Sequence, residues 1–180
     1  AFVLEAGALP TLAWLDGTSE VERDIEKLLD SMMEGGVAAV NIIPDRNWNI
    51  PDPKLRTVKV EKLHEVVACA RKYDLPVVIG TEINAYGQRF VDDFEAPELQ
   101  PLTETFLDGA YVLCGHTVLQ ARARIGYLSG WARKNFVSRR ERNAFYRRVG
   151  ACVAPGEAEA LDSLKPEMEP QDVLRICCKS

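Results

Sequence analysis

The feature that most constrains the fold of this chain is a recurring apolar run that ends at a glycine or a proline. Such runs begin near residues 2, 37, 77 and 110, about 35 residues apart. The run at 37–43 is apolar at nearly every position, which is typical of a strand buried on both faces of a parallel sheet. A spacing of this length matches a strand–helix unit and predicts an α/β fold built from consecutive parallel units.

Helix signals separate the expected strands. Ser19 and Glu22 have the spacing of a capping box before a run with apolar residues on one helical face, and Gly35-Gly36 ends that run. Pro53 is expected to keep the loop after the second strand extended. Further helices are expected over residues 60–73, 98–107, 118–136 and 138–149.

Four strand–helix units make half of an eightfold barrel, so we expect about half of a TIM-like barrel. A small doubly wound sheet is the alternative. Residues 1–150 are expected to form this domain, and residues 151–180 an acidic, loosely held C-terminal tail. The chain has no initiator Met and enters a strand-like run almost at once, so we expect it to be a piece of a longer barrel.

Composition narrows the class of protein. The net charge of −5 argues against nucleic acid as the main partner. No apolar stretch approaches the roughly 18–20 residues of a membrane helix, so no membrane partner is expected. The five cysteines are odd in number and fit no zinc motif, and Cys69 and Cys114 lie in apolar runs as expected of buried thiols. We therefore expect a reducing, cytoplasmic setting.

A basic segment rich in aromatic residues spans 122–148. Such a segment could bind nucleic acid. The interpretation we favour is a pair of amphipathic helices that pack their aromatic side chains inward and display arginine outward. A contact within a homo-oligomer is the intermediate possibility.

The strand ends carry the candidate functional residues. Glu82 follows the third expected strand behind Gly80, and His116 follows the fourth behind Gly115. Because the carboxyl ends of parallel strands form the active site in both candidate folds, each side chain is expected to project into that site. A carboxylate and an imidazole suit a divalent metal such as zinc or manganese, and they also suit general acid–base catalysis.

Five polar or aromatic residues follow the second expected strand. Asp45 could act as a base, and Arg46 could hold a phosphate or carboxylate group. Asn47, Trp48 and Asn49 are candidates for substrate binding, with Trp48 placed to stack on a sugar ring or base. The competing interpretation is an ordinary polar loop held by Asx turns.

The segment after Glu82 is longer than a simple connection needs, which favours a binding loop or lid. Asn84 and Gln88 are its candidate substrate-binding residues, and Asp92-Asp93 is expected to cap the next helix. His64 lies in mid-helix beside Leu63 and is expected to be a surface or edge residue.

The sequence Gly80-Thr81-Glu82 after one apolar run, followed by Gly115-His116 after the next, resembles the second half of metal-dependent hydrolase barrels. The most similar pattern is that of the PHP family (polymerase and histidinol phosphatase), and the amidohydrolase superfamily resembles it more loosely. The resemblance covers roughly residues 37–120 and implies that Glu82 and His116 are metal ligands. Both families carry His-x-His on their first strand; this sequence contains none, so that strand is expected upstream.

Together these features predict a metal-dependent hydrolase of a small polar substrate, either a phosphate ester or a C–N bond. Metal-activated water would attack, Asp45 would take its proton, and Arg46 would neutralise developing charge. A metal-assisted sugar isomerase or aldolase is one alternative, since Trp48, the asparagines and Gln88 suit hydroxyl-rich ligands. A non-catalytic half-barrel that binds a partner through open strand edges is the other.

Overall fold

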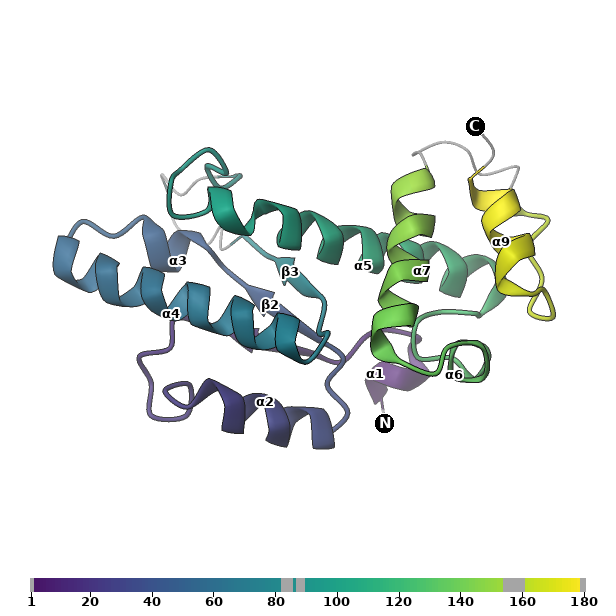
Figure 1. The fold of residues 1–180 in the computed structure, drawn as a ribbon, viewed down its shortest axis with the longest axis horizontal. Coiled ribbons are helices and arrows are strands. Elements are labelled where there is room, and N and C mark those ends of the chain that lie inside the picture. Colours follow the sequence, from purple (N-terminus) through teal and green to yellow (C-terminus); the bar gives the residue numbers. More distant parts are fainter. Residues whose placement is uncertain (1, 82–85, 87–89, 154–160, 179–180) are drawn as a thin grey trace. The chain divides into compact units, whose positions relative to one another are not determined.

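The computed structural model describes residues 2–81, 86, 90–153 and 161–178. Its elements are α1 (Phe2–Glu5), β1 (Thr11–Trp14), α2 (Ile25–Glu34), β2 (Ala39–Ile42), α3 (Asp45–Trp48), α4 (Pro53–Lys72), β3 (Val77–Ile79), η1 (Gln100–Leu102), α5 (Thr103–Ala123), α6 (Gly130–Asn135), α7 (Arg139–Cys152) and α9 (Pro170–Cys177) (Figure 1). The chain divides into two compact units: the sheet unit, residues 11–107, and the helical unit, residues 1–10 with 108–180.

The sheet unit is built on three parallel strands in the order β1-β2-β3. The predicted α/β class with parallel strands is therefore confirmed. The strands expected in 37–43 and 77–79 are present as β2 and β3. β2 has three buried residues out of four, as expected for a strand with neighbours on both sides.

One hydrophobic core holds the sheet unit together. It combines side chains from all three strands with α2, α4 and the segment that opens α5, including Trp14, Leu29, Val40, Leu63 and Phe106. α4 begins earlier than predicted because Asp52 caps it, accepting hydrogen bonds from the backbone N–H groups of Lys54 and Leu55. Pro53 thus starts this helix rather than extending the loop, which is a position that proline favours.

Two expected strands are absent from the positions that the apolar runs indicated. Residues 2–5 form the short helix α1, and the first strand is β1 at Thr11–Trp14. Residues 110–114 lie within α5, a helix of 21 residues, so the fourth strand is wrong. The physical reason is that a short apolar run has the same composition in a buried strand and in a helix packed on several sides.

In the helical unit, α5 and α7 cross at two glycines. A Cβ atom on Gly115 would overlap the backbone carbonyl of Tyr146, and one on Gly150 would overlap that of Tyr111. Gly115 therefore permits close helix packing, whereas the sequence pattern placed it after a strand. An ion pair between Arg147 and Asp108, 2.9 Å long, also joins the two helices.

Aromatic side chains form the centre of the helical unit. The rings of Phe136 and Phe145 lie 4.9 Å apart, and those of Tyr127 and Tyr146 lie 5.3 Å apart. Tyr127 and Tyr146 are fully buried. The prediction that this basic segment packs its aromatic residues inward is confirmed. The capping box of Ser138 and Glu141 at the start of α7 is also present.

The C-terminal segment contains α9, which contacts α7 (Figure 1). It buries Val173 and Cys177, and a disulfide joins Cys152 to Cys178. Cys69 and Cys114 are free thiols, the first buried and the second partly buried.

Among the helices within the described ranges, none is long and apolar enough to cross a membrane.

Candidate active site at the carboxyl edge of the sheet

The three strands of the sheet unit end together. Trp14 is in register with Ile42, and Ile42 with Ile79, so the segments that follow all three strands leave the same edge of the sheet. This is the edge at which α/β folds bind their ligands, because the strand ends and loops leave an open crevice there. The polar side chains of these segments therefore define the candidate site.

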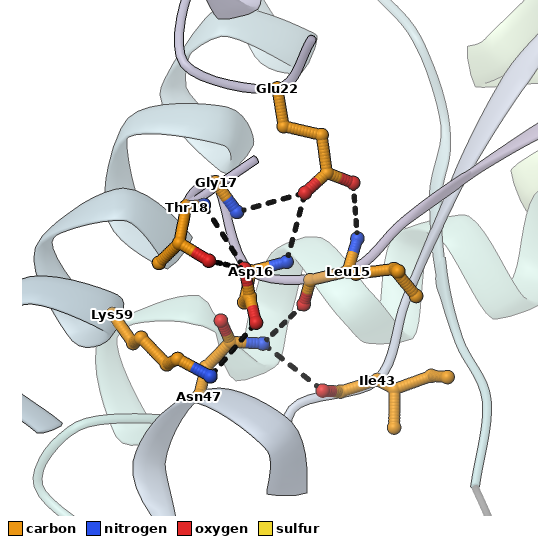
Figure 2. Close-up of polar contacts among 8 residues, drawn as sticks. All are labelled: Leu15, Asp16, Gly17, Thr18, Glu22, Ile43, Asn47 and Lys59. Carbon is orange, nitrogen blue, oxygen red and sulfur yellow. Dashed lines mark hydrogen bonds and ion pairs between the residues drawn. The ribbon is translucent and has the colours of Figure 1, made fainter. Parts of the chain in front are cut away.

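An ion pair between Asp16 and Lys59 lies at this edge (Figure 2). Asp16 follows β1 by two residues, and Lys59 reaches it from α4 with a distance of 2.8 Å between Nζ and Oδ2. The two side chains are only 14% and 15% exposed. Burial raises the pKa of Asp16, but hydrogen bonds from Lys59 and Thr18 outweigh burial and leave the pKa below its ordinary value. The carboxylate is therefore ionised at neutral pH.

The turn after β1 is held by the carboxylate of Glu22. Its two oxygens accept hydrogen bonds from the backbone N–H groups of Leu15, Asp16 and Gly17, at 2.8, 3.4 and 3.2 Å (Figure 2). Since these donors belong to consecutive residues, one side chain sets the path of the whole turn. Glu22 thereby positions Asp16 against Lys59.

Asn47 connects the ends of two strands. Its Nδ2 donates to the carbonyl oxygens of Leu15 and Ile43, both at 3.1 Å. The residue is fully buried, and its Oδ1 has no hydrogen-bond partner among the described residues. Asn47 was predicted to bind substrate. The structure shows it holding the carboxyl ends of β1 and β2 together, with one oxygen acceptor still open.

The other candidates after β2 lie on the short helix α3 or, for Asn49, directly after it, where the sequence indicated a loop. Asp45 accepts a hydrogen bond of 2.9 Å from Nδ2 of Asn49, and Arg46 is partly buried. Trp48 packs against the core and donates from Nε1 to Asp92, at 3.0 Å. The indole is thus held by core packing and by this hydrogen bond. The roles of Asp45, Arg46, Asn49 and Trp48 toward a substrate stay predictions.

The predicted residues of the next segment, Glu82, Asn84 and Gln88, lie outside the described residues. Gly80 and Thr81, which precede them, leave the same edge of the sheet after β3. Asp93 accepts a hydrogen bond from the backbone N–H of Glu95 at 3.2 Å, a local turn contact. His64, expected at a surface or edge, bonds to the carbonyl of Glu98 at 2.9 Å.

His116 lies in the helical unit, in the interior of α5, where the sequence indicated a strand end. Its Nδ1 accepts a hydrogen bond from the backbone N–H of Tyr127 at 3.0 Å, and the ring also bonds to the backbone of Gly7. Burial, the larger effect, holds the pKa of His116 below its ordinary value. Both contacts would have to be reorganised before the ring could bind a metal.

Within residues 2–81, 86, 90–153 and 161–178, no three His, Cys, Asp or Glu side chains are grouped so as to hold a metal ion. Comparison with protein-family models, curated proteins and solved structures found no match for this chain.

Sequence reasoning missed the pair of Asp16 and Lys59. Asp16 carries the same signal that drew attention to Glu82, since it stands beside a glycine just after an apolar run. The first strand was expected near residue 2 rather than at Thr11–Trp14, so Asp16 was not predicted to follow a strand. Lys59 has no local signal, because only folding brings α4 next to a residue 43 positions away.

Proposed function

We propose that this chain is part of a metal-dependent hydrolase that acts on a small polar substrate at the carboxyl edge of its sheet. The observation that carries the proposal is the register of β1, β2 and β3, which ends all three strands at one edge. Asp45, Arg46 and the ion pair of Asp16 with Lys59 follow or face those ends. Charged groups gathered at this place in an α/β fold are the usual catalytic arrangement.

The order of the strands supports the finer proposal of a half-barrel. β1, β2 and β3 are neighbours in the order in which they occur in the chain. A TIM-like barrel adds its strands in this order, and so does the first half of a Rossmann-type sheet, whereas a flavodoxin-like sheet does not. In this proposal the remaining strands belong to a longer protein.

A divalent metal fits the donor chemistry of this edge. The unpartnered, buried Oδ1 of Asn47 is an oxygen donor, and the resemblance to the PHP family adds the carboxylate of Glu82. A metal bound there would lower the pKa of a coordinated water. His116 is left out of this proposed ligand set, because its ring is engaged by the backbone of Tyr127 and Gly7.

The chain's own side chains would divide the remaining work. Asp45 would accept the proton of the attacking water, and its hydrogen bond from Asn49 would fix the carboxylate in place. Arg46 would balance negative charge that develops on a phosphate or carbonyl oxygen. Lys59 and Asp16 would keep the turn after β1 in a fixed position beneath the substrate.

Elemental analysis of the purified protein tests the metal. We expect near-stoichiometric zinc or manganese in the wild type and a loss of it in Glu82→Ala. The His116→Ala variant is the discriminating control: we expect it to keep its metal, although it will be less stable. Wild-type protein that binds no metal even after reconstitution would overturn the metal-dependent mechanism.

Turnover tests the chemistry. We expect hydrolysis of at least one substrate in a panel of p-nitrophenyl phosphate esters and cyclic amides, and a fall of about 10²–10⁴-fold in kcat for Asp45→Asn. Glu34→Gln is the control, because Glu34 is exposed at the end of α2, which leads into the opposite edge of the sheet. Isomerisation or cleavage of a sugar phosphate in place of hydrolysis would favour the isomerase or aldolase alternative.

A further inference from the structure

A second candidate site lies within the helical unit, in a pocket of about 300 Å³ beside the C-terminal half of α5. A pocket of this size suits a small molecule. The side chains and backbone that matter for its chemistry are Gly7, His116, Gln120, Arg124, Ser129 and Arg133. None of the described residues that line it is acidic.

Two arginines give the pocket its charge. Within the part of the chain that the structure describes, neither Arg124 nor Arg133 has a carboxylate partner. Other arginines of the helical unit do: Arg122 is paired with Asp162 and Arg147 with Asp108. Two guanidinium groups without counter-charge on one pocket favour an anionic occupant, and guanidinium geometry matches carboxylate and phosphate groups.

Gln120 is held in place between two glycines. A Cβ atom on Gly7 would lie 2.6 Å from Nε2 of Gln120, and one on Gly126 would overlap its Oε1. The Oε1 atom accepts a hydrogen bond of 3.2 Å from the backbone N–H of Gly126. Since the acceptor end of the amide is used in this way, its NH₂ group is the end that can donate to a ligand.

His116 forms part of the pocket wall and is held neutral. Its Nδ1 accepts the Tyr127 N–H, and burial lowers its pKa. A neutral ring adds no charge at neutral pH, so the positive potential of the pocket comes from the two arginines.

Arg124 occupies a backbone conformation that favours glycine. Its φ is 57°, in the left-handed region, directly after the last residue of α5. Its N–H donates to the carbonyl of Gln120 at 3.1 Å, which closes the helix end. Glycine is the common residue at this helix position, because other residues are strained there. An arginine at this place directs a guanidinium to the pocket at a cost in stability.

We propose that this pocket binds a small oxyanion, the phosphate or carboxylate group of a small metabolite, between the guanidinium groups of Arg124 and Arg133. The amide NH₂ of Gln120 donates a hydrogen bond to the same group. The pocket lies wholly within the helical unit and takes no part in the proposed hydrolysis at the sheet. Its occupancy can therefore be tested without turnover.

The test is isothermal titration of the full chain with inorganic phosphate, sulfate and succinate at constant ionic strength. We expect saturable binding of at least one of these anions, and a loss of at least tenfold in affinity for Arg133→Ala. Preference for phosphate and sulfate would identify a phosphate ligand, and preference for succinate a carboxylate. Arg122→Ala is the matched control: it removes the same charge outside the pocket, and affinity should stay within twofold.

Arg124→Gly gives a second, independent readout. We expect the Tm of the ligand-free protein to rise by about 2–4 °C, because glycine relieves the left-handed strain. Anion affinity should fall at least tenfold in the same variant. Equal losses in Arg122→Ala and Arg133→Ala would overturn the proposal, because general surface charge would then explain the binding. The absence of saturable binding up to about 10 mM of every anion would also overturn it.

Discussion

Among single residues, His116 shows how local geometry determines what a side chain can do. The backbone N–H of Tyr127 occupies its Nδ1, and Gly7 engages the ring from its own backbone. The imidazole therefore joins three segments of the helical unit: α1 with its following turn, α5, and the turn after α5. His116 was predicted as a metal ligand, and the structure shows it linking these segments. Burial keeps the ring neutral, because it lowers the pKa by more than the Gly7 hydrogen bond raises it.

We expect His116 to make stability depend on pH. Its pKa is lowered in the folded state, so the unfolded chain binds a proton that the folded chain does not. Stability is then fully present above about pH 6.5 and falls as the pH drops below that value. Urea unfolding of the wild type at pH 7.5, 6.5 and 5.5 should show this decrease.

The variant His116→Asn should lose this slope between pH 6.5 and 5.5 and be about 1–3 kcal/mol less stable at pH 7.5, because the amide does not replace the packing of the buried ring or its contact with Gly7. His64→Asn is the control and should keep the slope. An unchanged slope in His116→Asn would show that another group is responsible.

Among the elements, the crossing of α5 and α7 depends on the absence of two side chains. Gly115 and Gly150 face the backbone of the opposite helix, so the two helix axes approach more closely than alanine would allow. The neighbouring atoms at this contact belong to the backbone of the opposite helix. They cannot move aside to accommodate a Cβ atom, whereas the end of a flexible side chain could. This crossing places Tyr146, whose hydroxyl bonds to the carbonyl of Ile125 at 2.5 Å, in the centre of the unit.

We predict that Gly150→Ala destabilises the protein by about 2–3 kcal/mol. The overlap with the carbonyl of Tyr111 outweighs the roughly 1 kcal/mol that alanine adds to a helix interior. Chemical denaturation measures the difference. Gly130→Ala is the matched control, since a Cβ atom there meets nothing within 4 Å and the change should be neutral or slightly stabilising. A neutral Gly150→Ala would contradict the close crossing.

For the whole molecule, the division into two units follows from where the core lies. Every residue of the main hydrophobic core falls between Leu12 and Phe106, inside the sheet unit. The helical unit has its own aromatic centre around Tyr127 and Tyr146. A unit with a complete core can fold without its neighbour in the chain.

We therefore predict that residues 11–107 fold as an isolated fragment. It should unfold cooperatively by circular dichroism, and Leu63→Ala in the fragment should cost about 2–5 kcal/mol, because Leu63 is fully buried. Gel filtration would reveal whether the outer edges of β1 and β3, which pair only with β2 in the described residues, cause association. A fragment that melts without cooperativity would show that its core needs residues beyond 107.

Much of the sheet unit could be predicted from local patterns. The apolar runs at β2 and β3 were correctly assigned. In the helical unit, so was the capping box that starts α7. The segment 110–114 was assigned to the wrong element, because its five residues carry no periodicity that separates a strand from a buried helix. Because the same helix contains His116, the prediction that His116 follows a strand end is also wrong.

The sequence by itself determined the parallel α/β class and which polar residues follow β2, since both depend on neighbours along the chain. Only the tertiary structure decided that Asp16 meets Lys59, that Asn47 joins two strand ends, and that Arg124 and Arg133 share a pocket. These contacts depend on how helices and strands pack, and packing brings together side chains whose separation in the sequence carries no signal.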